Sequence, residues 1–163
     1  MAILKWTLIV LVGLALLSVI AGQFRLFQGR PPAGLGVHEG RLMPPSKTPN
    51  SVSSQAGLHA DHPQRQYAEI APLALRGGGS ETLARIKTVV EGMRGAKVIR
   101  SEADYLYAQF TTPLMKYVDD TEFWYDPAAG VIQVRSASRV GRGDLGANRG
   151  RVESIRAKLA AAP

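Results

Sequence analysis

The sequence predicts an α+β domain: an antiparallel sheet of about four or five strands with two helices packed on one face, preceded by an N-terminal transmembrane helix. Three observations predict this. The chain opens with an uncharged apolar run, two later segments have apolar residues at helical spacing, and strand-like runs rich in Tyr, Phe, Val and Ile lie between them. That order is typical of a sheet with its helices on one side.

The apolar run comes first. Residues 6–22 read WTLIVLVGLALLSVIAG without a charge. With residues 2–4 the run reaches about 20 residues, the length that spans a bilayer. We assign residues 1–22 to a transmembrane anchor or signal segment. Small residues at 19–21 offer a signal-peptide cleavage site, but the run is longer than a usual signal core, which favours an uncleaved anchor.

Charge does not orient this segment, because Lys5 lies before it and Arg25 and Arg30 follow it closely. A lone N-terminal span ahead of one globular domain most often exports that domain. We therefore expect an inner-membrane protein of the cell envelope, with its domain facing the periplasm.

A tether and a single domain follow the apolar run. Residues 23–46 are rich in proline and glycine and show almost no hydrophobic period, so they predict a tether. Residues 47–163 are then the α+β domain, long enough for one hydrophobic core.

Two helices are predicted in this domain. The first covers 80–93, where Leu83, Ile86, Val90 and Met93 recur at helical spacing, and Gly92 and Gly95 end it. The second follows Asn148 as its candidate N-cap and has one apolar face, made of Val152, Ile155 and Leu159.

Strands are predicted between and before these helices, at 97–102, 104–111, 115–125, 131–138 and 66–73. The sequence DPAAG at 126–130 is typical of a hairpin turn. If Tyr125 faces Val131 across this turn, Asp120 lies opposite Ser136 and Thr121 opposite Arg135.

Composition excludes several classes of function. The chain carries 20 Lys and Arg against 13 Asp and Glu, a net charge of +7, and it has no cysteine. The missing thiols exclude a disulfide scaffold, a thiolate metal site and a cysteine nucleophile. Acidic residues dominate 101–126 and basic residues dominate 127–163, so we expect the two blocks to pair within the fold. Aromatic residues do not interleave with the basic block, so no nucleic-acid partner is expected.

The carboxylates of the segment 115–125 indicate that acidic side chains lie on both faces of the predicted strand. Strand alternation places Asp119 on one face and Asp120 and Glu122 on the other, so neither face can be buried without a carboxylate. A buried carboxylate needs a partner, and Arg135 and Arg139 are the nearest donors. Two interpretations stay open. One is a structural network of ion pairs; the other is a polar pocket in which Asp119, Asp120, Glu122, Arg135, Ser136, Ser138 and Arg139 converge.

The polar motifs are PNSVSS at 49–54, VDD at 118–120 and RSASRVGRGDLGAN at 135–148. On these motifs the chain resembles the domain of unknown function 1499, an uncharacterised bacterial and plastid family. The resemblance implies no established activity. With Glu122 added, it suggests a set of candidate binding residues: Asn50, Ser53, Ser54, Asp119, Asp120, Glu122, Arg135, Ser136, Ser138, Arg139, Asp144, Asn148 and Arg151.

No catalytic residue, metal ligand or cofactor is assigned from the sequence. No motif that activates a serine surrounds Ser53 and Ser54, so a loop that hydrogen-bonds its own backbone is expected there. Alternation turns Asp119 away from the other two acids, which argues against a cation site. His59 and His62 lack further ligands for zinc.

Three hypotheses about function remain. The first is a non-enzymatic, membrane-anchored envelope protein that binds an anionic lipid, glycan or protein partner through Arg135, Arg139, Arg142 and Arg151. The second is a hydrolase or transferase whose acid pair is Asp119 with Asp120 or Glu122. The third is a purely structural domain in which the polar residues only hold the fold together.

Overall fold

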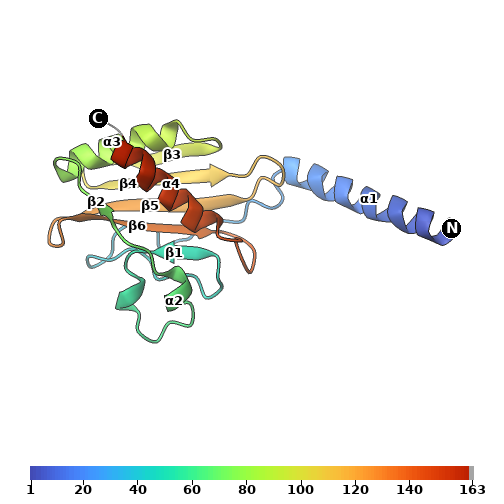
Figure 1. Ribbon diagram of the computed structural model, residues 1–163, viewed down its shortest axis with the longest axis horizontal. Coiled ribbons are helices and arrows are strands. Elements are labelled where there is room, and N and C mark those ends of the chain that lie inside the picture. The colour runs from blue at the N-terminus through green and yellow to red at the C-terminus, as the bar shows by residue number, and fades with distance from the viewer. Residues whose placement is uncertain (162–163) are drawn as a thin grey trace.

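The central element is a six-stranded antiparallel sheet, seen in a computed structural model that describes residues 1–161 (Figure 1). The elements run α1 (Ala2–Gln23), β1 (Ser51–Ser53), η1 (Ala56–Leu58), α2 (Arg65–Ala68), β2 (Leu73–Ala74), α3 (Gly79–Glu91), β3 (Ala96–Ser101), β4 (Tyr105–Thr111), β5 (Val118–Asp126), β6 (Val131–Ser138) and α4 (Ala147–Ala161). The strand order is β1-β6-β5-β4-β3, and β2 also pairs with β6. The predicted α+β class is confirmed, with six strands in place of four or five.

The long strands and both domain helices match their predictions: β3 to β6, α3 and α4. The strand predicted at 66–73 is mostly wrong, because residues 65–68 form a short helix and only Leu73 and Ala74 join the sheet. Pro72 has no N–H to donate, so pairing can begin only after it. Strand β1 was not predicted, because it has three residues and only Val52 is apolar.

The predicted hairpin register is wrong by one residue. Asp126, not Tyr125, pairs with Val131. The Asp126 carboxylate accepts hydrogen bonds from the N–H groups of Ala128 and Ala129, and its carbonyl accepts one from Gly130. Gly130 has a φ of 63°, which glycine adopts easily. This arrangement tightens the turn to 127–130 and keeps Asp126 in the ladder.

The corrected register changes which polar residues face each other. Glu122 lies opposite Arg135, and Thr121 lies opposite Ser136. An acid and an arginine therefore become direct cross-strand neighbours.

Helices α3 and α4 cover one face of the sheet. The core there joins Ile86 of α3 and Ile155 of α4 to Leu106, Phe123 and Val134 of the three central strands, all nearly inaccessible to solvent. Burial of these side chains drives the packing of the layers.

An extended arm, residues 35–46, lies against the opposite face of the sheet. Its Leu42 is buried in a second cluster with Tyr105, Tyr107 and Trp124. Gln55 holds the arm in place, since its side-chain oxygen accepts the N–H of Leu42 and its amide donates to the carbonyl of Gly40. The second half of the sequence assigned to a tether is thus the covering layer of this face.

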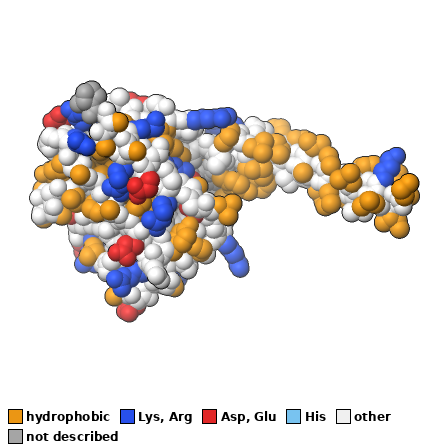
Figure 2. All heavy atoms as spheres, in the orientation of Figure 1, with side chains coloured by type: hydrophobic (Ala, Val, Ile, Leu, Met, Phe, Trp, Pro, Cys, Tyr) orange, Lys and Arg blue, Asp and Glu red, His pale blue; other side chains and the backbone are white. Residues whose placement is uncertain are grey.

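Helix α1 projects from one end of the sheet, and hydrophobic side chains cover it up to the domain (Figures 1 and 2). It has 22 residues, and an 18-residue window within it has a mean hydropathy of 2.4, so it is long and apolar enough to cross a membrane. Gly22 packs closely against the backbone of Met115, and the Gln23 amide donates to the carbonyl of Leu114. The end of α1 is therefore attached to the loop between β4 and β5.

Candidate functional site

The polar residues of the central strands are divided between the two faces of the sheet. Asp119 faces the helices, whereas Asp120 and Glu122 face the arm, as alternation predicts. Both faces therefore bury a carboxylate. The seven residues of the predicted pocket do not converge in one place, because β5 and β6 separate them.

On the helix face, Asp119 pairs with Arg151 of α4. The Arg151 Nη2 donates to Asp119 Oδ2 over 2.5 Å, and both side chains are largely buried. The guanidinium also lies 4.5 Å from the centre of the Phe110 ring, close enough for a cation–π contact. Sequence reasoning missed this pairing, because it depends on where α4 packs.

Asn148 is the centre of a polar network beside this pair. Its amide nitrogen donates to the carbonyl of Asn50, the hydroxyl of Ser138 and the carboxylate of Asp144. Its oxygen accepts hydrogen bonds from the Ser136 hydroxyl and the Arg151 guanidinium, and the residue is completely buried. The network joins β6 and α4 to the segment that leads into β1.

Asp144, not Asn148, caps helix α4, so the predicted cap is wrong. The Asp144 carboxylate accepts the N–H groups of Gly146 and Asn148 and the hydroxyl of Tyr67. Asn148 is already the second residue of the helix, which leaves its side chain free to point into the interior.

Lowering the pH is expected to destabilise the wild type more than an Asp144→Asn variant. Burial raises the pKa of the Asp144 carboxyl, but hydrogen bonds from Tyr67, Asn148 and Gly146 outweigh it and hold the pKa below its usual 3.8. A depressed pKa stabilises the fold above the unfolded value, and this contribution is lost as the pH falls through the folded value. Denaturant unfolding at about pH 6 and about pH 3 measures the difference. Equal losses in both proteins would contradict it.

On the arm face, Asp120 forms a bidentate ion pair with Arg139. The Arg139 Nε and Nη2 each donate over 2.8 Å, and the Tyr107 hydroxyl also donates to this carboxylate. Burial raises the pKa of Tyr107, and its hydrogen bond to Asp120 raises it further. Asp120 is therefore fully engaged within the fold.

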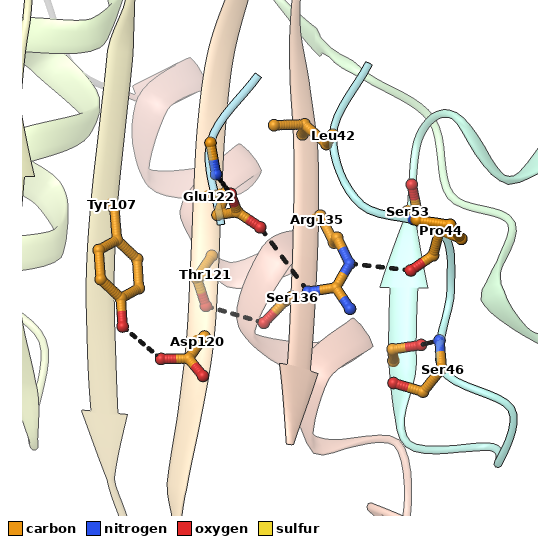
Figure 3. Close-up of polar contacts among 12 residues, drawn as sticks. Leu42, Pro44, Ser46, Ser53, Tyr107, Asp120, Thr121, Glu122, Arg135 and Ser136 are labelled. Atoms are coloured by element: carbon orange, nitrogen blue, oxygen red, sulfur yellow. Dashed lines mark hydrogen bonds and ion pairs between the residues drawn. The ribbon is translucent and has the colours of Figure 1, made fainter. Parts of the chain in front are cut away.

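Glu122 and Arg135 form the deepest pair (Figure 3). Glu122 Oε1 accepts the N–H of Gly36 and the hydroxyl of Tyr105, and Arg135 Nε donates to the carbonyl of Pro44. Arg135 Nη1 lies 3.7 Å from Glu122 Oε2, too far for a hydrogen bond. Neither buried atom has a hydrogen-bond partner among residues 1–161. Burial raises the pKa of the Glu122 carboxyl, against the effect of Arg135 and the two donors.

The remaining candidate residues hold loops together. Ser53 accepts the N–H of Gln55, Ser54 bonds Gln133 and Val134, and Asn50 donates to the carbonyl of Gly141. No group of three or more His, Cys, Asp or Glu placed to hold a metal is found in residues 1–161. A role of the thirteen candidates in ligand binding stays a prediction.

Two cavities of about 500 Å³ each lie at the end of the sheet nearest α1. The first, on the helix face, is mainly apolar and includes Leu26, Phe27, Tyr117, Val140 and Leu145. The second, on the arm face, includes four basic residues in its wall, namely Arg30, Lys47, Arg135 and Arg139. Sequence reasoning missed both cavities, because each is lined by segments far apart in the chain.

The fold and the interior pairs define a class of protein: an antiparallel α+β domain with an N-terminal apolar helix and arginine–carboxylate pairs buried on both faces of its sheet. The chain belongs to the family described as protein of unknown function (DUF1499), whose family model matches residues 41–159. No curated protein and no solved structure matches the chain. The resemblance seen in the motifs is thereby confirmed.

Proposed function

We propose that this protein is a membrane-anchored, non-enzymatic binding protein whose helix-face cavity takes the hydrocarbon part of an anionic lipid. One observation carries the proposal. The wall of the apolar cavity includes Leu26 and Phe27, which lie only three and four residues after the end of α1 at Gln23. The cavity therefore adjoins the membrane wherever α1 spans it.

The length of α1 supports this position. A helix of 22 residues extends about 33 Å, close to the hydrocarbon thickness of a bilayer. Gln23 would then lie at the level of the headgroups, together with the β4–β5 loop attached to it. The domain also exposes large apolar side chains at this end, namely Phe24, Leu26, Leu114 and Leu145. A bilayer surface would cover them.

An unpaired basic side chain at the same end supports an anionic lipid. Of the four arginines in the first hypothesis, Arg135, Arg139 and Arg151 are paired with carboxylates inside the fold. Arg142, near the cavity, is exposed and has no side-chain partner within residues 1–161. Each exposed basic residue close to an anionic membrane adds about 1 kcal/mol of attraction.

The acid-pair hydrolase finds less support. A general acid–base pair needs carboxylates that face a common open site. Here Asp119 faces away from Asp120 and Glu122, and each of the three forms an ion pair with its own arginine. The structural hypothesis accounts for these pairs, and the lipid proposal adds a role for the cavity.

A cavity-filling variant tests the proposal. The full chain is placed in nanodiscs that contain a phospholipid with a photoactivatable group in its acyl chain. We expect adducts on 112–117 and 140–147, and roughly fivefold fewer in Ala147→Trp, because Ala147 lines the cavity. Ala74→Trp places the same side chain on an exposed residue outside the cavity and should label like the wild type.

Adducts on α1 report insertion in every sample and serve as the internal standard. Labelling of α1 without labelling of the cavity segments would overturn the proposal. Equal labelling of the cavity segments in Ala147→Trp would also overturn it, because it would indicate contact with the surface only.

A further inference from the structure

We propose that the second cavity, on the arm face of the sheet, is a binding site for a phosphate group. The cavity lies between the end of β6 and the arm and encloses about 500 Å³. Its walls carry Arg135, Arg139, Arg30, Lys47, His62 and Asp120. The site is distinct from the hydrocarbon cavity, because it lies mainly on the other face of the sheet, and only Ser138 borders both.

Arg135 is the residue that points to a ligand. Its side chain is only 4% exposed, yet Nε alone donates a hydrogen bond. Nη1 lies in the ion pair with Glu122 but donates no hydrogen bond, and neither does Nη2, within residues 1–161. Figure 3 shows this second amino nitrogen without a dashed line to any residue drawn. Buried guanidinium donors are normally satisfied, and a phosphate oxygen is an acceptor that matches their planar geometry.

The charge around Arg135 favours a dianion. Asp120 is neutralised by its two hydrogen bonds from Arg139, and Glu122 by Arg135. Arg30 and Lys47 are exposed at the cavity and have no ion pair in the described chain, so two positive charges remain. His62 Nδ1 accepts the N–H of Gln64, which leaves the other ring nitrogen as a donor. A phosphate monoester carries close to two negative charges at neutral pH.

Two prolines of the arm form the cavity wall beside these donors. Pro44 and Pro45 of the arm form part of the wall, and Pro44 also accepts the Nε–H of Arg135. The donor set is therefore held by a rigid segment of backbone. The phosphate could belong to a lipid headgroup or to a soluble ester, because both present the same oxygens.

The test uses the full chain in phosphatidylcholine nanodiscs, titrated with glycerol 3-phosphate and followed by calorimetry. We expect a dissociation constant of roughly millimolar or below, and about tenfold weaker binding in the double variant Arg30→Ala with Lys47→Ala. Both side chains are exposed, so the variant should fold normally. Lys97→Ala, an exposed lysine on β3 outside this cavity, is the matched control and should bind like the wild type.

Repeating the titration in nanodiscs that contain phosphatidic acid separates the two sources. If the wild type binds glycerol 3-phosphate in phosphatidylcholine discs but not in discs that contain phosphatidic acid, the site is assigned to a lipid headgroup. Undiminished binding would assign it to a soluble phosphate. Binding that is unchanged in the double variant would overturn the site, and so would the absence of any heat in phosphatidylcholine discs. Neither result depends on labelling of the hydrocarbon cavity.

Discussion

Replacing Glu122 with glutamine is expected to lower the free energy of unfolding by about 3–5 kcal/mol, because the change leaves the buried Arg135 without its counter-charge. Glutamine has nearly the same shape, and its oxygen can still accept the hydrogen bonds from Gly36 and Tyr105. Its amide group would then face Arg135 Nη1, a donor that already lacks an acceptor. The variant therefore isolates the charge from the packing.

The measurement is denaturant unfolding of the detergent-solubilised full chain, followed by near-ultraviolet circular dichroism. Glu102→Gln is the matched control, because Glu102 pairs with Arg100 while both side chains are about half exposed. An exposed ion pair is screened by water and contributes little, so this control should unfold nearly like the wild type. A similar small effect in Glu122→Gln would show that solvent reaches Arg135.

Asn148→Ala should cost about 3 kcal/mol or more, although alanine favours a helix. The substitution removes five hydrogen bonds and leaves buried partners on three separate segments, among them the Asn50 carbonyl, the Ser136 hydroxyl and one Arg151 nitrogen. Unfolding of the same preparation measures the loss. Glu153→Ala, on an exposed position of α4, should change stability by less than about 0.5 kcal/mol. An equal loss of unfolding free energy in Asn148→Ala and Glu153→Ala would refute the central role of Asn148.

Much of the fold follows from local patterns. Alternating and helical periods predict β3 to β6, α3 and α4, because each of these elements carries several apolar side chains on a face that becomes buried. The three-residue strand β1 has no such signal, and it exists because β6 offers it a free edge. The arm was read as a tether because its prolines and glycines suppress any period, although Leu42 is fully buried.

The site could be predicted only in part. Alternation along β5 correctly places carboxylates on both faces of the sheet. The partners depend on register and on helix packing, neither of which is encoded locally. One residue in the turn moves Arg135 from Thr121 to Glu122, and the docking of α4 brings Arg151 to Asp119. The cavities could not be predicted at all, because their walls are formed by segments that are far apart in the sequence.

The strand order has a consequence for synthesis of the chain. The segment after β1 hydrogen-bonds β6 across 80 residues of sequence, and the arm receives its bond from Arg135 across 91. Strand β1 and the bond from Arg135 to the arm therefore lack their partner until residues 131–138 have left the ribosome. Pairing over such distances closes slowly. Strands β1 and β2 therefore cannot join the sheet, and the domain cannot close, until β6 has been made.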